Sequence, residues 1–355
     1  MTHRFPVKEI ARQSGLSTAT IDRVLNDRPN VSAQTRRQVR DAIEELTRQE
    51  GQLAARGRRL FIDVVVEAPS RFSNAIRTAL EAELPSLHPA VIRPRYMMQE
   101  RMRSGDVVAI LARIAKRGSQ GVLLKAQDQP DIRHALSMLR NRNIPVLTIF
   151  TDIPDAGQIA YAGANNKAAG ETAAYLLHHF LAGRPNKGAI LITLSNERFR
   201  GEEARKEGFI AALARLAPQR QIIDASGGAG LDHDTADRVK SIIGQTANIA
   251  AVYSMGGGNR AILKTLADHG ISPAIYIAHD LDAENITLLE QGKLTAVLHH
   301  DLRQDMRTAC HHLMAWHGLL PHGAIAPASD IQIITPANIP AFAKEQARTF
   351  KTGLA

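Results

Sequence analysis

A short segment near the N-terminus carries side chains suited to contact with DNA. Thr18, Ala19 and Arg23 fall on the polar face of a predicted helix. Short side chains let a helix backbone approach base edges in the major groove, and the planar guanidinium of Arg23 can donate two hydrogen bonds to guanine. Hydroxyl and amide side chains near predicted helix ends can hold phosphates, namely Ser17, Thr20, Asn26, Ser32 and Thr35. The alternative is that these are ordinary helix caps and surface residues, and capping is expected for Ser17 and Ser32 in either case.

Three short amphipathic helices are predicted to position these side chains. Pro6 suits the first turn of a helix, which Gly15 can end in a left-handed conformation. The second helix follows Ser17 and turns Ile21, Val24 and Leu25 inward. The third follows Ser32 and carries apolar residues at 39, 42, 43 and 46. A tight glycine-containing turn between the first two helices is typical of a helix-turn-helix.

The positive charge of the chain is concentrated in the same region. The net charge is +9, and residues 1–60 hold twelve Arg and Lys against seven Asp and Glu. About a sixth of the chain therefore carries more than half of the excess. Such a distribution indicates an anionic partner, with nucleic acid the first choice. Charge alone leaves a solvated basic tail as the alternative.

The N-terminal segment resembles a known family. Residues 7–26 and 31–36, followed by Val39, closely resemble the headpiece of the lactose-repressor (LacI) family of transcription regulators. The resemblance implies that Thr18, Ala19 and Arg23 occupy base-reading positions. It also implies binding to palindromic, double-stranded operator DNA as a homodimer, and the sequence leaves open whether dimers pair into tetramers.

The connector after the headpiece departs from the family pattern. Family members continue with a hinge helix that wedges a leucine into the minor groove. Here this stretch is shorter, and residues 52–56 are the best hinge candidate, with Leu53 as the wedge. Arg56 adds a further positive charge for phosphates. A plain basic linker over residues 47–60 is the alternative.

Beyond residue 60, apolar runs alternate with amphipathic stretches. Strands are predicted at 60–66, 121–124, 145–150, 188–193, 249–253 and 274–278. Helices are predicted near 74–84, 107–117, 130–142, 167–182, 201–215, 232–246 and 259–269. This alternation predicts doubly wound parallel sheets, and about 280 residues favour two α/β lobes with a cleft between them. The predicted fold is therefore an all-α helix-turn-helix headpiece (1–46), a connector (47–60), a two-lobed domain (61–345) and a C-terminal tail (346–355).

The resemblance extends to the lobes, which look like sugar-binding, periplasmic-binding-protein-like domains. The segments that carry it lie at 143–146, 161–174, 195–209, 278–280 and 295–300. A sugar or polyol needs carboxylates, amides and arginines around its hydroxyls and an aromatic face against its C–H side. The predicted effector-binding residues, all near strand ends, are Phe72, Asp128, Asp152, Asn165, Arg198, Arg200, Asp280 and His300. Asp280 heads this set, whereas Asp128 and Asp152 could equally cap helices and His300 could lie on the surface.

Other classes of function are weighed against this one. Residues 256–261 fit the dinucleotide fingerprint G-x-G-x-x-A, and Asp280 lies 22 residues past Gly258, which keeps an NAD(P)-binding oxidoreductase as the alternative. The motif is, however, far from the first strand of the α/β region. Histidine pairs at 178–179, 299–300 and 311–312 lack metal-ligand spacing, and surface or cleft positions are expected for them, so neither metal nor cofactor is predicted. Without a nucleophile elbow, P-loop or paired carboxylates, the sequence predicts no enzyme activity.

The compartment is predicted from what the sequence contains at its N-terminus and from its cysteine content. One cysteine, Cys310, cannot form an intramolecular disulfide. No uncharged apolar run reaches about 18 residues, so no membrane partner is expected. Charges near the N-terminus fit no secretory segment, which argues against an extracytoplasmic solute-binding protein. We therefore expect a cytoplasmic transcription regulator, with repression as the favoured mode. A small effector is expected to control its affinity for the operator.

Overall fold

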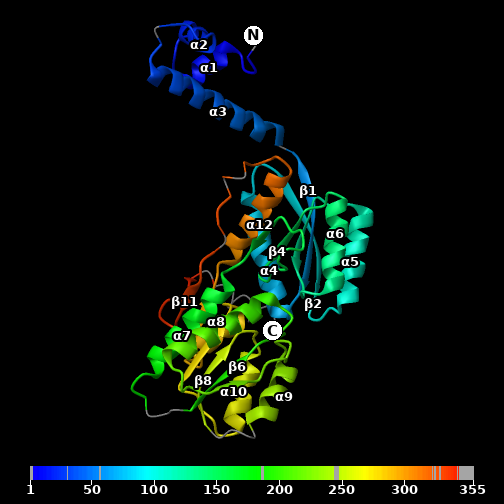
Figure 1. Ribbon diagram of the computed structural model, residues 1–355, viewed down its shortest axis with the longest axis vertical. Helices are drawn as coiled ribbons and strands as arrows, with labels where there is room; N and C mark the ends of the chain where they lie inside the picture. Colours follow the sequence, from blue (N-terminus) through cyan, green and yellow to red (C-terminus); the bar gives the residue numbers. More distant parts are fainter. Residues whose placement is uncertain are drawn as a thin grey trace.

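The computed structural model describes residues 3–343, except 30, 56, 185–187, 244–247, 322, 324, 328 and 342. The side chains of residues 48–55 also lie outside the described set. Figure 1 shows a small helical headpiece, a long helix that leaves it, and two α/β lobes stacked along the long axis. None of the described helices is long and apolar enough to cross a membrane.

The headpiece consists of α1 (Val7–Ser14), α2 (Thr18–Leu25) and the first part of α3 (Ala33–Ala55). Its core is small and apolar, formed by Phe5, Ile10, Ala11, Ile21 and Val39. Gly15 ends α1 at φ 67°, in the left-handed region that favours glycine. The predicted helix-turn-helix is therefore present, with its turn where the sequence places it.

The connector differs from the sequence prediction. A third helix ending near residue 46 and a separate hinge helix at 52–56 were expected, whereas α3 is continuous through Ala55. Residues 44–50 contain no proline and are mostly good helix formers, and the single Gly51 costs a helix only about 1 kcal/mol. The Leu53 side chain and the whole of Arg56 lie outside the described residues, so their DNA contacts stay predictions.

Lobe 1 comprises residues 59–162 together with a helix near the C-terminal end of the described chain. Its strands are β1 (Arg59–Glu67), β2 (Val91–Gln99), β3 (Gly121–Lys125), β4 (Val146–Ile149) and β5 (Ala160–Ala162). They form a parallel sheet in the order β2-β1-β3-β4-β5. Its helices are α4 (Ser70–Glu83), the short 3-10 helix η1 (Leu84–Ser86), α5 (Ser104–Arg117), α6 (Pro130–Asn141) and α12 (Leu302–Trp316). One face of the sheet packs on α5 and α6, and the other on α4 and α12.

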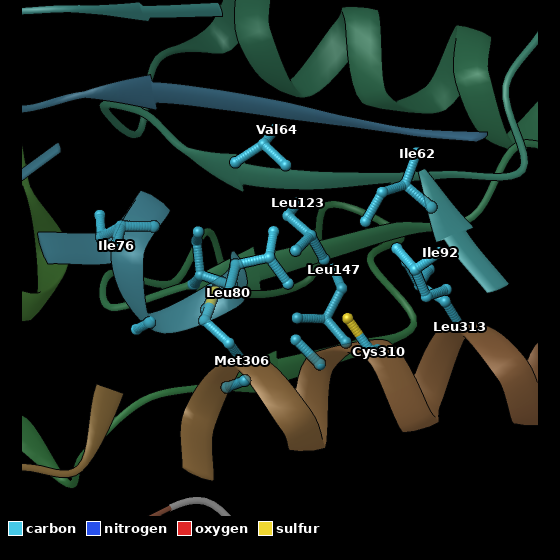
Figure 2. Close-up of a cluster of buried hydrophobic side chains, with 14 of the residues drawn as sticks. Ile62, Val64, Ile76, Leu80, Ile92, Leu123, Leu147, Met306, Cys310 and Leu313 are labelled. Atoms are coloured by element: carbon cyan, nitrogen blue, oxygen red, sulfur yellow. The ribbon is translucent and has the colours of Figure 1, made fainter. Parts of the chain in front are cut away.

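The core of lobe 1 joins distant parts of the chain. Figure 2 shows Ile62 and Leu123 of the sheet facing Met306, Cys310 and Leu313 of α12. Burial raises the pKa of the Cys310 thiol to about 12, so this cysteine behaves as a small apolar core residue. Lobe 1 is therefore complete only when the chain returns to it after passing through lobe 2.

Lobe 2 comprises residues 163–299 and one late strand. Its strands are β6 (Ala189–Thr193), β7 (Ile222–Asp224), β8 (Ile249–Ser254), β9 (Ile275–His279), β10 (Ala296–His299) and β11 (Gln332–Ile334). The order is β11-β10-β9-β8-β6-β7, and only β11 is antiparallel to its neighbour. Its helices are α7 (Asn166–Leu181), α8 (Arg200–Leu216), α9 (Asp232–Ile243), α10 (Asn259–Asp268) and α11 (Ala283–Glu290). The predicted pair of doubly wound α/β lobes is confirmed.

Helices α7 and α8 pack closely because glycine stands where they touch. A Cβ at Gly170 would overlap the carbonyl oxygen of Arg205, and one at Gly208 would overlap that of Lys167. This close approach fixes the start of α8, which supplies side chains to the space between the lobes.

Candidate ligand cleft and DNA-contacting surface

The outer face of α2 presents the side chains predicted to read bases. Ile21 is fully buried, whereas Thr18, Ala19 and Arg23 are exposed. The carboxylate of Asp22 accepts a hydrogen bond from Asn26 Nδ2 at 2.8 Å and lies 3.4 Å from Arg28. This pairing balances the one negative charge beside Arg23, so the surface stays compatible with a polyanion.

The hydroxyl residues at two helix starts form matching caps. Ser17 Oγ accepts the Thr20 amide at 3.1 Å, and the two hydroxyls lie 2.8 Å apart. Ser32 and Thr35 repeat the arrangement at 3.0 and 2.8 Å. The capping predicted for both serines is confirmed. Contact of Ser17, Thr20, Ser32 and Thr35 with phosphates stays a prediction.

A cavity of about 50 Å³ lies between the lobes, where strands of both sheets end. Its lobe 1 wall consists of Ala68, Pro69, Arg71, Phe72, Lys125, Phe150 and Thr151. Its lobe 2 wall consists of Ser195, Phe199, Glu202, Arg205, Met255, Gly256, Gly257, His279, Asp280 and Asp282. The carboxyl ends of parallel strands are where open α/β sheets bind ligands. We call this cavity the cleft.

Two cations form the floor of the cleft. Lys125 is the last residue of β3, and its ammonium donates to the Glu67 carbonyl at 2.9 Å and lies 3.7 Å from the ring centroid of Phe199. Burial lowers the pKa of Lys125 to about 8. Arg205 of α8 donates to Asn166 Oδ1 at 2.6 Å and to the Met255 carbonyl at 3.1 Å. Lys125 therefore faces the lobe 2 wall from lobe 1, whereas Arg205 belongs to the lobe 2 wall itself.

Three carboxylates supply the acceptors. Asp280 directly follows β9 at φ 65°, and its Oδ1 is buried with no hydrogen-bond partner among the described residues. Burial raises the pKa of Asp282 to about 6, although the nearby Arg71 charge acts to lower it. Glu202 accepts the amide of Ser195 at 2.6 Å and also its hydroxyl. A buried acceptor without a partner calls for an explanation, and a donor brought by a ligand is the simplest one.

Buried histidines support this acceptor wall. His300 Nε2 lies 3.6 Å from Asp280 Oδ1, and its Nδ1 is 2.5 Å from Asp305 Oδ2. His279 Nε2 lies 2.7 Å from the Tyr253 hydroxyl, and burial holds the pKa of His279 well below its usual value. His300 is only 2% exposed, so it stands behind Asp280 and not on the surface.

The apolar side of the cleft is aromatic. Phe72 and Phe150 meet edge to face, with ring centroids 5.4 Å apart. Phe150 follows β4 at φ 63°. Of the predicted effector-binding residues, Phe72 and Asp280 line the cleft. Their contact with a ligand stays a prediction.

Three residues predicted from strand ends serve local structure away from the cleft lining. The carboxylate of Asp128 is held by Arg133 at 2.6 and 2.7 Å. Asp152 accepts the Thr148 hydroxyl at 2.6 Å and the amide that follows it at 2.8 Å. Asn165 is the N-cap of α7 and accepts the Ala168 amide at 3.0 Å. None of the three lines the cleft, because a short polar side chain near a helix start is readily satisfied by its neighbours, and their contact with an effector stays a prediction.

The two predicted arginines are also placed elsewhere. Arg198 and Arg200 are exposed, and Arg200 pairs with Glu203. Arg198 lines a wider groove outside the cleft. The arginine of α8 that reaches the cleft is Arg205, which shares the inner face of this helix with Phe209. Helical spacing from the core residue Phe209 is the signal that could have selected it.

Sequence reasoning missed five charged residues that line the cleft, namely Arg71, Lys125, Glu202, Arg205 and Asp282. Lys125 directly follows the strand predicted at 121–124, so the strand-end rule could have found it. Asp282 could have been found as the N-cap of a helix, since it accepts the Asn285 amide at 2.8 Å. Glu202 and Arg71 lie within helices, and no local pattern singles them out.

The three histidine pairs lie on α7, at the end of β10 and on α12. In the described part of the chain, no three His, Cys, Asp or Glu side chains are grouped so that they could hold a metal ion. His299 and His300 are buried, contrary to the surface position that the sequence left open. Burial lowers the pKa of His299 to about 4, so this residue is neutral at pH 7.

Comparison with known families agrees with both halves of the structure. Residues 95–315 match the periplasmic binding protein domain, and residues 7–47 match the bacterial regulatory proteins of the lacI family. The chain belongs to the periplasmic binding protein domain family and carries a lacI-family headpiece.

Individual proteins resemble parts of this chain. It is 28% identical over 151 residues to the HTH-type transcriptional regulator TreR of Salmonella typhimurium, a match that covers 42% of this chain and 40% of TreR. GanP of Geobacillus stearothermophilus shares the fold at a TM-score of 0.69 and 18% identity, over 80% of this chain and 99% of GanP. A putative LacI transcriptional regulator of Bacteroides fragilis has a TM-score of 0.67 at 15% identity, over 79% of this chain and 98% of that protein.

Proposed function

We propose that this protein is a transcription regulator whose operator binding is controlled by a small polyhydroxyl effector. Repression is the favoured mode of regulation. The observation that carries the proposal is the pairing, on one chain, of an exposed α2 face with a cleft in which a buried Asp280 oxygen accepts no hydrogen bond from the described residues. The proposal includes a homodimer that acts in the cytoplasm on double-stranded DNA. It includes no enzymatic step and no cofactor.

The composition of the cleft supports a sugar or polyol as the effector. Each hydroxyl of such a ligand both donates and accepts, so the ligand can accept from Lys125 of lobe 1 and Arg205 of lobe 2 and donate to Asp280 of lobe 2. Phe72 and Phe150 supply a face for its C–H groups. GanP is described as a glucose-galactose binding protein, which agrees with this class of ligand.

The proposed mechanism is a shift between two arrangements of the lobes. An effector that contacts both walls favours one arrangement over the other. Since α3 runs without interruption from the headpiece to within four residues of β1, movement of lobe 1 changes the spacing of the two headpieces in a dimer. Linkage then requires operator DNA to change effector affinity by the same factor.

The oxidoreductase alternative gains no support from the loop that suggested it. Gly258 lies at the start of α10 with φ 76°, so this glycine is required by the backbone of the turn. Gly256 presents its carbonyl oxygen to Arg71, whereas a pyrophosphate would need amide hydrogens. The loop follows β8, in the middle of the lobe 2 sheet.

The proposal is tested by DNA binding with and without candidate effectors. Duplexes from the upstream region of the gene are titrated with protein by fluorescence anisotropy at several salt concentrations. We expect one duplex to bind in preference to scrambled DNA, with an affinity that falls steeply with salt. A thermal-shift screen of sugars, polyols and sugar acids, with NAD as a control, selects the compounds to add. Equal binding to all duplexes, or a shift with NAD alone, would refute the proposal.

A further inference from the structure

One side chain of lobe 1 crosses the cleft and binds lobe 2. Arg71, in the first turn of α4, places Nε 3.1 Å from Asp282 Oδ2. Its Nη1 donates to the Gly230 carbonyl at 2.9 Å and its Nη2 to the Gly256 carbonyl at 3.4 Å. The three partners lie on three different loops of lobe 2. A single guanidinium therefore connects α4 with the loops after β7, β8 and β9.

The lobe 2 loops leave room for this guanidinium. A Cβ at Gly257 would overlap the Arg71 guanidinium, so any other residue there would displace it. Gly257 also has φ 88°, which favours glycine in its own right. The Arg71 side chain is 27% exposed and that of Asp282 9%, so the ion pair is largely shielded from water.

The space left beside Arg71 is too small for an effector. The cleft has a volume of about 50 Å³, whereas pockets for drug-sized ligands measure about 300–1,000 Å³. A few water molecules fit, but a sugar ring does not. Binding of a sugar therefore requires the guanidinium to leave, the lobes to open, or both.

We infer that the Arg71 side chain occupies part of the effector site in the cleft. Its guanidinium donates to lobe 2 where donor groups of an effector would bind, and it holds the lobes closed until an effector displaces it. This inference rests on the proposed function of the cleft as the effector site. It also narrows the chemical class of the effector. Displacement leaves two carbonyl oxygens and the Asp282 carboxylate facing the ligand, all of them acceptors. The end of the effector at this wall therefore carries hydroxyl or cationic donors, and a carboxylate or phosphate at that end is excluded by repulsion.

The first test needs neither DNA nor sugar. Arg71→Ala in the full chain should open the lobes, seen as a larger radius of gyration in X-ray scattering. Amide exchange in residues 227–231 and 255–258 should rise roughly tenfold or more, as expected when charge-assisted hydrogen bonds between two elements are lost. Circular dichroism and the thermal midpoint check that the variant is folded.

A matched control tests whether any ion pair between the lobes has the same effect as the one in the cleft. Arg101 of lobe 1 pairs with Asp234 of lobe 2, and their side chains are 58% and 38% exposed. Exposed pairs of this kind contribute little. Arg101→Ala removes the same charge and an ion pair between the same lobes, so it should leave the scattering profile close to that of the wild type.

Chemical rescue tests whether the loss of the guanidinium donors is what opens the lobes. Methylguanidinium at millimolar concentration should return Arg71→Ala to the wild-type radius and exchange rates, and should not alter Arg101→Ala. A closed Arg71→Ala protein, or an open one that methylguanidinium leaves open, would overturn the inference. If the DNA and sugar assays fail while opening and rescue are observed, the proposed function is wrong and the role of Arg71 stands.

Discussion

Replacing Lys125 by methionine should stabilise the protein at neutral pH. Lys125 is only 8% exposed, and burial lowers its pKa from 10.5 to about 8. A folded-state pKa below the unfolded one means that the folded protein disfavours the proton. Below about pH 8 the ammonium therefore reduces the free energy of unfolding by about 3 kcal/mol, at about 1.4 kcal/mol for each pKa unit. This cost declines as the pH rises from about 8 and vanishes above 10.5, where both states are neutral.

Urea unfolding measured between pH 7 and 10.5 tests this expectation. The only tryptophan of the chain, Trp316, ends α12 and reports on lobe 1, the lobe that contains Lys125. We expect Lys125→Met to exceed the wild type by up to about 3 kcal/mol at pH 7 and to converge with it near pH 10.5. Buried tyrosines whose pKa is raised, such as Tyr253, titrate in both proteins and cancel in the difference.

The control is Lys116→Met, which removes an exposed lysine from the C-terminal turn of α5 in the same lobe. It should change the free energy of unfolding by no more than about 0.5 kcal/mol at any pH. A difference between Lys125→Met and the wild type that stayed constant from pH 7 to 10.5 would refute the reasoning. We further expect Lys125→Met to lose the effector-induced thermal shift, since a costly buried cation is retained where binding needs it.

Three further substitutions test other parts of the structure. Arg23→Ala should weaken cognate operator binding by about 1–3 kcal/mol in anisotropy titrations and relax the sequence preference, whereas Arg12→Ala should weaken all duplexes alike. Gly170→Ala should lower the free energy of unfolding in urea by roughly 1–3 kcal/mol, because its Cβ overlaps the Arg205 carbonyl, and an unchanged value would mean that α7 and α8 can separate freely. Asp280→Asn keeps the size and the left-handed conformation but removes the charge, so it should abolish the effector thermal shift and leave effector-free DNA binding unchanged. A retained shift would exclude Asp280 from the site.

Much of the fold could be predicted because its central strands are continuous apolar runs. β3, β8 and β9, together with β1 from Ile62 onward, are buried on both faces, so their apolar runs can be recognised directly in the sequence. β2 was missed because Arg93, Pro94 and Arg95 interrupt it, which a strand at the edge of the sheet tolerates. The return of α12 to lobe 1 depends on contacts between residues far apart in sequence, which no local pattern records.

The site was only partly predictable for a related reason. The rule that ligands meet strand ends selected Phe72 and Asp280, and both line the cleft. The same rule selected Asp128 and Asp152, which do not line it, because a polar residue after a strand can bind its own loop as readily as a ligand. Arg71 lies within a helix, and its partners belong to the other lobe.

The passage of the chain through lobe 2 before it returns to lobe 1 has a consequence during translation. The headpiece core uses only residues 5–46, so it can fold on the ribosome as soon as this segment has emerged. Lobe 1 has to wait for Met306, Cys310 and Leu313, which emerge after most of the chain has been made. Nascent or truncated chains that end before α12 thus contain the headpiece proposed to contact DNA together with an incomplete lobe 1. Lobe 1, which follows the headpiece in the chain, can be completed only after α12 has been synthesised.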